Sequence, residues 1–273
     1  MRQFDLRRPT AMFSLLVWLG ACGSGRAAEP ESLSFQAYCG GLDAAEISFV
    51  AEQQDGRYHG HLSILTHGMT HWMTRLLVDS DSWGTVTPTG FRPLTFSQVS
   101  SSREKNRRIE MRFVDEGETA EKLVDDERRN DASLAPADPD DLDPPVPEEA
   151  RHHVLDPVTA LFEMGRRGMA GEKTFVLAVF DGRRRYDLAV EAVGPGSHDI
   201  GGKTYDTLDL KAVMNPLYGF RPRAMDFWKN AGFNVFVGRD IGLPVKISTT
   251  TFTAETVIGL HASCRGVLPC PPS

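Results

Sequence analysis

Short stretches of alternating apolar and polar residues, separated by turns that contain glycine, run through most of this chain. In residues 58–65, Tyr58, Leu62 and Ile64 share one parity and polar residues take most of the other, which is the period-two pattern of a β-strand. Asp55-Gly56 just before it is a hairpin turn signal. Many such strands at short spacing favour an antiparallel sheet. The sequence therefore predicts a mainly β fold, either a curved antiparallel sheet or an open β-barrel.

The predicted strands lie on both sides of one long interruption that begins after residue 114. They are two strands within 33–49, followed by 58–65, 72–78, 79–86, 94–98, 107–114, 173–181, 185–194, 203–214, 234–240, 244–252 and 255–264.

One helix is predicted inside the interruption, at Val154–Arg167. Asp156 is placed to cap its N-terminus, and Pro157 suits its first turn. Val158, Leu161 and Phe162 fall on one face at helical spacing, so we expect them to pack on the sheet.

The rest of the interruption is acidic. Residues 115–150 hold fourteen Asp and Glu against three Lys and Arg, a net charge of −11 in a chain whose total is −7. The segment has no aromatic residue and ends in a run rich in proline. Because such a segment buries too little apolar area to offset its ordering entropy, we predict a mobile acidic loop over 115–150.

The N-terminus has the three parts of a secretory signal, namely early arginines, the apolar run 11–19 and small residues up to Ala28. The apolar run is too short for a transmembrane span. We therefore expect residues 1–28 to be a signal peptide and residues 29–273 to be one exported domain. Two ways of processing the signal peptide stay open. Leu19-Gly-Ala-Cys22 resembles a lipobox, in which Cys22 would carry a lipid anchor, and cleavage after Ala27 or Ala28 would give a soluble periplasmic protein.

Three cysteines, Cys39, Cys264 and Cys270, remain after the signal. In an oxidising compartment one disulfide and one spare thiol are expected. Cys39–Cys264 would tie the two ends of the chain together if their strands are neighbours, and Cys264–Cys270 is the local alternative.

Charge excludes one class of partner. Outside the acidic segment the net charge is +4, and most of that lies in the signal, so the folded body is near neutral. Without a basic stripe, nucleic acid is not an expected partner. The sequence has no second long apolar run, so no transmembrane span is predicted.

Five short stretches occur in an order that resembles the exported bacterial proteins grouped as domain of unknown function 3108. They are Tyr38–Glu46, Gly90–Phe96, Leu155–Ala160, Phe180–Tyr186 and Gly242–Val245. The resemblance implies a curved antiparallel β-structure with a helix inserted midway. Since that family has no established activity, the resemblance implies no catalytic residue.

Four of the eight histidines lie close together in the sequence, at His59, His61, His67 and His71. His59-Gly-His61 on a strand places two imidazoles on one face, an arrangement that can bind zinc or copper. The opposing interpretation is a solvated strand face. His59 and His61 are the metal-ligand candidates.

A second candidate site combines cations with aromatic residues. Arg183, Arg184 and Arg185 follow Asp181-Gly182 and suit binding of a phosphate or headgroup, although a plain β-hairpin explains the same residues. Tyr218, Phe220 and Trp228 suit the mouth of a ligand site or a membrane edge, and a core role is the alternative.

The motifs of common enzyme classes are missing from the sequence, and no cofactor is predicted. The leading hypothesis is a non-enzymatic envelope protein that binds an apolar or lipid-like ligand on its curved sheet. One alternative is a structural or interaction module that binds another envelope protein. The other is a metal-dependent hydrolase that uses the histidine cluster.

Overall fold

The computed structural model describes residues 30–115, 118–130, 143–251 and 254–266. Thirteen strands form one antiparallel sheet, as the sequence predicts. They are β1 (Glu31–Cys39), β2 (Leu42–Gln54), β3 (Arg57–Thr66), β4 (Leu77–Thr87), β5 (Gly90–Ser101), β6 (Lys105–Val114), β7 (Thr119–Arg129), β8 (Thr174–Phe180), β9 (Arg185–Ile200), β10 (Lys203–Tyr218), β11 (Ala231–Gly238), β12 (Pro244–Thr249) and β13 (Thr256–Arg265).

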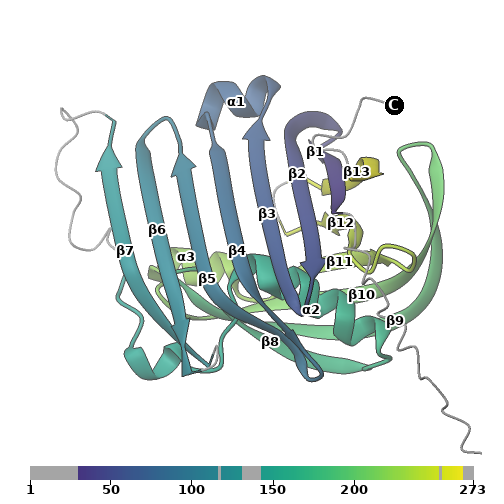
Figure 1. Cartoon of the computed structure of the whole chain (residues 1–273). Helices are drawn as coiled ribbons and strands as arrows, with labels where there is room; N and C mark the ends of the chain where they lie inside the picture. The colour runs from purple at the N-terminus through teal and green to yellow at the C-terminus, as the bar shows by residue number, and fades with distance from the viewer. Residues whose placement is uncertain (1–29, 116–117, 131–142, 252–253, 267–273) are drawn as a thin grey trace, which may run out of the picture.

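The sheet consists of two meanders joined at their ends. Strands β1 to β7 follow one another on one side, and β8 to β13 do so on the other. The pairing of β1 with β13 joins the two, so β7 and β8 are the edges of the sheet. The sheet curves until these edges approach, which gives a nearly closed barrel (Figure 1).

Helix α2 (Pro157–Met169) lies inside the curve and connects the two meanders (Figure 1). The segment before it crosses from one sheet edge to the other. His152 forms a β-bridge with Thr119 of β7, and Leu155 forms one with Val179 of β8. We call residues 143–156 the strap, because they link both edges of the open sheet.

The predicted face of α2 packs as expected. Asp156 caps the helix by accepting hydrogen bonds from the backbone N–H groups of Val158 and Thr159, both at 2.9 Å. Val158 and Phe162 are buried in the main core, and Leu161 is half-buried at its border. Gly60 explains part of this fit, since a Cβ there would lie 2.6 Å from Val158 and 2.7 Å from Phe162. The glycine between the two histidines therefore allows the helix to approach β3.

Two short helices were not expected from the sequence. Residues 72–78, predicted as a strand, are divided between α1 (Gly68–Thr74) and the start of β4. The aromatic segment after β10 contains α3 (Pro222–Trp228). Both helices have seven residues, which is too short for the 3.6-residue period to stand out from an alternating pattern. The described residues thus contain three α-helices rather than one, together with a 3₁₀ turn, η3, at Glu148–Arg151.

The prediction of a single mobile loop over 115–150 is wrong for much of the segment. Residues 119–129 form β7, which pairs with β6 along its length. Ala120 and Val146 are buried in the main core. Carboxylates of β7 are neutralised by arginine and lysine side chains, so the net charge of the segment does not prevent its folding. Residues 131–142 lie outside the described residues.

The two cysteine pairings have different outcomes. In the β1–β13 ladder Cys39 faces Thr256 and Cys264 faces Ser32, so the two cysteines lie at opposite ends of an antiparallel pair. Cys39 is an exposed free thiol, and the predicted Cys39–Cys264 bridge is wrong. Cys264 is not free, and Cys270 lies outside the described residues, so Cys264–Cys270 stays a prediction.

The predicted signal peptide, including Cys22, also lies outside the described residues. Within the described part of the chain, none of the helices has the length and apolar character needed to cross a membrane.

Candidate functional site

An apolar groove opens on the concave face of the sheet. It has a volume of about 170 Å³, and every residue that lines it is apolar. Its wall combines β1, β2 and β3 from the first meander with β12 and β13 from the second, and α2 contributes Leu161. The lining residues are Phe35, Ile47, Phe49, Leu62, Ile64, Leu161, Leu243, Pro244, Ile247 and Ile258.

The groove exists because the concave side chains of these strands are apolar but incompletely covered. Phe35 and Phe49 are buried, whereas Leu62, Ile64 and Ile258 stay half-buried although they point inward. An apolar cavity of roughly 150 Å³ stays dry and accepts a benzene-sized molecule. The groove can therefore accept a small apolar molecule or part of an alkyl chain.

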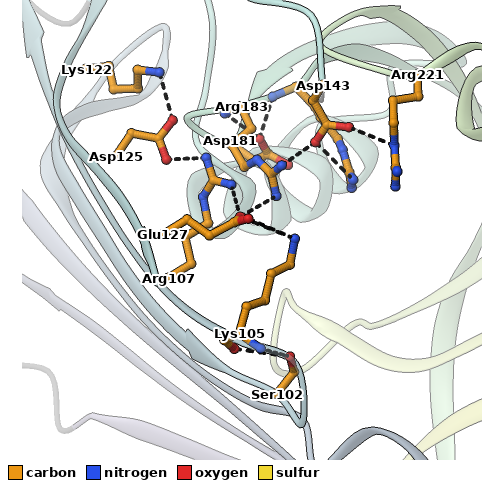
Figure 2. A network of polar contacts seen from close by, with 11 residues as sticks. Ser102, Lys105, Arg107, Lys122, Asp125, Glu127, Asp143, Asp181, Arg183 and Arg221 are labelled. Atoms are coloured by element: carbon orange, nitrogen blue, oxygen red, sulfur yellow. Dashed lines mark hydrogen bonds and ion pairs between the residues drawn. The ribbon is translucent and has the colours of Figure 1, made fainter. Parts of the chain in front are cut away.

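A second concave region has the opposite character. Ion pairs link β6, β7, the strap, the hairpin between β8 and β9, and the residue before α3 (Figure 2). We call this network the charged clamp. It consists of Lys105, Arg107, Lys122, Asp125, Glu127, Asp143, Arg183, Arg184 and Arg221. Several of its members line a cavity of about 360 Å³.

Arg107 is the centre of the charged clamp on the sheet. Its guanidinium bonds Asp125 and lies 2.7 Å from a carboxylate oxygen of Glu127. Burial and the nearby Arg183 lower the pKa of Arg107, in that order of size, while the two carboxylates raise it. Its Nε is buried with no hydrogen-bond partner within the described residues. Charge is thus concentrated on the inner face of β6, and Arg107 lies only two residues before the buried Ile109 on that face.

The predicted arginine and aromatic candidates are only partly brought together. Arg183 bonds Asp143, and Arg184 lies 3.8 Å from the same carboxylate. Arg184 also lies over the ring of the buried Phe220, 5.4 Å from its centroid. The β8–β9 hairpin therefore holds the strap. This role is close to the alternative interpretation of the arginines as part of a plain β-hairpin.

Of the other members of that candidate group, Trp228 alone joins Phe220 in a cluster. Arg185 donates to the Asp187 carboxylate at 2.7 Å, and Tyr218 is exposed at the end of β10. Trp228 packs with a small cluster that includes Phe220 and Met214. The two stretches of the chain that supply these residues meet at Arg184, Phe220 and Trp228, whereas Arg185 pairs with Asp187 and Tyr218 is exposed.

A buried polar cluster lies under the first turn of α2. Asp156 accepts a hydrogen bond from the Ser82 hydroxyl at 2.9 Å and another from the Thr159 hydroxyl. Tyr58 and Thr159 share a hydrogen bond of 2.6 Å. Burial raises the pKa of Asp156, which its hydrogen bonds partly oppose, and burial with the nearby Asp156 raises that of Tyr58. Asp156 is therefore more than a helix cap, because it also joins α2 to β4.

The histidines divide into separate groups. His59 and His61 lie on the convex face of β3, where they contact Asp79 and Asp81 of the neighbouring strand β4. His71 contacts the Thr66 carbonyl oxygen through Nδ1 at 3.0 Å. His67, six residues beyond His61, lies 3.6 Å from a carboxylate oxygen of Glu46. The four histidines thus do not converge on one site, contrary to the cluster required by the hydrolase hypothesis.

The fold places this protein in the class of barrel-like proteins built from one curved antiparallel sheet. Comparison with known families places it more narrowly. The chain belongs to the DUF3108 family of proteins of unknown function, whose family profile matches residues 34–257. None of the curated proteins compared with the chain matches it.

The solved structures that match the chain include two that cover most of it. One is a β-barrel-like protein of domain of unknown function DUF1849 from Brucella abortus, at 10% identity and a TM-score of 0.54, covering 88% of this chain and 99% of that one. The other is described as a "putative lipoprotein" from Parabacteroides distasonis, at 9% identity and a TM-score of 0.34, covering 87% and 96%. The first likeness confirms the fold.

Sequence reasoning missed Asp81, Arg107 and Asp143. A signal for Asp81 was present, since Asp79 and Asp81 alternate on a predicted strand beside the strand of His59 and His61. Asp143 was not recoverable, because its partners are in a hairpin forty residues later in the chain.

Proposed function

We propose that this protein is a non-enzymatic protein of the cell envelope that binds an apolar or lipid-like molecule in the groove on its concave face. The observation that supports this most directly is the apolar groove, whose lining comes from both meanders and α2 without a polar residue. Burying an alkyl chain there removes apolar surface of both partners from water. This stabilises the complex by roughly 25 cal/mol for each Å² of apolar surface buried.

The form of the sheet favours this proposal. Ligand sites are concave and mostly apolar, and they occur in the mouths of β-barrels. The half-buried Leu62, Ile64 and Ile258 are large aliphatic residues that point inward without complete cover. An occupant of the groove would complete their burial.

The proposal is tested with a fluorescent fatty acid as the probe and a pair of adjacent variants. Ile64 lines the groove, and Leu65 is 40% exposed on the opposite face of the same strand. Ile64→Asn should weaken probe binding about tenfold or more, since a poorly paired amide in an apolar site costs ~1–3 kcal/mol. Leu65→Asn should leave binding unchanged.

Native mass spectrometry of protein purified from its own host gives a second readout, in which a retained apolar molecule is expected. Absence of saturable probe binding by the wild type, or equal losses in the two variants, would contradict the proposal. Circular dichroism of both variants separates loss of binding from loss of folding.

Export is part of the proposal and has its own test. The N-terminal pattern of arginines, apolar run and small residues supports it. Protein recovered from the periplasm or membrane should lack residues 1–20. Cys22→Ala should release the protein from membranes if the lipobox is used, and an unchanged soluble location would indicate cleavage after Ala27 or Ala28.

A further inference from the structure

The convex face of the sheet carries a cross-strand group of imidazoles and carboxylates that faces away from the groove. Strands β3 and β4 pair directly here, with His61 opposite Asp81 and Ser63 opposite Asp79. His59 and His61 alternate on one strand, as Asp79 and Asp81 do on the other, so all four side chains share one face.

The atoms of this group converge on one carboxylate. Asp81 Oδ1 lies 2.9 Å from His59 Nε2 and 3.1 Å from His61 Nδ1. His61 Nε2 lies 3.5 Å from Asp79 Oδ2. Among the described residues, His61, Asp79 and Asp81 are the set of three whose ligand atoms all lie within 4.8 Å of one another.

We propose that His61, Asp79 and Asp81 bind a divalent first-row transition-metal ion of the Zn²⁺ or Cu²⁺ kind. One imidazole nitrogen and two carboxylate oxygens are donors that such ions accept at about 2.0–2.2 Å. In a tetrahedral site neighbouring ligand atoms are about 3.4 Å apart. The three side chains, whose ligand atoms lie within 4.8 Å of one another, therefore draw closer together around a bound ion. All three are half-buried, so water can complete the coordination.

His59 acts as a positioning residue for this site. It contacts Asp81 through one ring nitrogen, and its other ring nitrogen lies 3.6 Å from a carboxylate oxygen of Glu52 on β2. Its ring also stacks on Trp83, with centroids 3.8 Å apart and an interplanar angle of 12°. Outer-shell hydrogen bonds to a ligating carboxylate orient it in known metal sites, and His59 is placed to supply one to Asp81.

The hard cations Ca²⁺ and Mg²⁺ fit the site less well, because they prefer an all-oxygen shell and one donor here is an imidazole. The chain also contains a natural control. His198 and Asp209 form a cross-strand pair on β9 and β10 at 2.8 Å, with one imidazole and one carboxylate only. That pair matches the chemistry of the proposed site but lacks its third ligand.

The test is isothermal titration of the untagged full chain with Zn²⁺, followed by three variants. The wild type should bind one ion, and Ca²⁺ or Mg²⁺ should give no comparable binding. His61→Gln should lower Zn²⁺ affinity more than ~100-fold, and His59→Gln by ~10–100-fold, the range for an outer-shell partner. His198→Gln should not change it. Thermal melts without metal establish that each variant is folded.

Trp83 supplies an independent readout. Cu²⁺ at this site should quench the fluorescence of Trp83 through its proximity to His59, and the quenching should be lost in both His61→Gln and Trp83→Phe. The proposal is overturned by a wild type that binds no stoichiometric Zn²⁺, or by equal losses in His61→Gln and His198→Gln. Neither outcome bears on the groove, which lies on the other face of β3.

Discussion

The apolar groove and the charged clamp share the concave face of one sheet, yet opposite kinds of side chain build them. Around the groove, aromatic and aliphatic residues of five strands meet α2. At the clamp, arginines of β6 and of the β8–β9 hairpin meet carboxylates of β7 and the strap. The groove lies where the two meanders pair through β1 and β13, and the clamp lies where the sheet remains open between β7 and β8.

This difference follows from what each region must do. Where strands pair continuously, the backbone is satisfied and the interior needs only apolar burial. At the open edges the strap provides few backbone bridges, so side-chain ion pairs supply additional links. Stability around the groove should therefore be insensitive to salt and acid, whereas that of the clamp should depend on both.

The largest effect is expected on the apolar side. Phe162 packs against the rings of Phe49, Tyr58 and Phe91, with centroid distances of 5.5, 5.3 and 5.2 Å. Phe162→Ala should lower the free energy of unfolding by ~3–5 kcal/mol, since it leaves a cavity among these rings. Urea denaturation at low and high salt measures this, and the loss should be the same at both. A loss that depends on salt would mean that ion pairs also stabilise the core around Phe162.

Asp156 is expected to have the next largest effect. As a cap alone its replacement by Ala would cost ~0.5–2 kcal/mol, but buried hydroxyls that lose a partner add to that cost, so we expect ~2–3 kcal/mol. Asp156→Asn keeps a capping oxygen and should cost less than Asp156→Ala. Urea denaturation of both variants tests this order. If Asp156→Ala abolished probe binding while the fold stayed intact, Asp156 would be a binding residue.

Arg107 tests the charged clamp. Its side chain is 10% exposed, and Arg107→Met would remove the partner that Asp125 and Glu127 share, leaving them Lys122 and Lys105. We expect a loss of ~1–3 kcal/mol, below that of a fully buried pair because both carboxylates are partly exposed. Arg108→Met, on the opposite face of β6 and 63% exposed, is the matched control and should cost less than ~0.5 kcal/mol. The loss for Arg107→Met should shrink in 1 M salt.

The smallest expected effect is the loss of stability in acid, which should be seen at the charged clamp and not around the groove. Burial raises the pKa of Asp125 and Glu127, but their Lys and Arg partners outweigh it, so both pKa values fall below the usual range. Carboxyls with lowered pKa values in the folded state stabilise it above their unfolded pKa, near 4, and this contribution is lost as the pH falls through the folded values. Thermal melts between pH 6 and 2 should show a shallower acid decline for Arg107→Met than for the wild type. Identical declines would mean that these carboxyls do not stabilise the fold.

Much of the fold follows from local sequence. Alternation and glycine turns located most strands, and the Asp156-Pro157 start with an apolar stripe located α2, because each signal comes from residues adjacent in the chain. Residues 119–129 were missed for a related reason. A β-strand whose inward carboxylates are neutralised from other segments has the composition of a disordered one.

The class of fold, the inserted helix and the family could thus all be predicted from the sequence. Three features required the folded chain: β1 meets β13 and separates Cys39 from Cys264, Arg183 holds the strap, and Asp81 lies between two histidines. The physical reason is that secondary structure depends on periodicity over a few residues, whereas each of these contacts depends on register between segments distant in the chain. Register is set by packing of the whole sheet around α2, which no local pattern encodes.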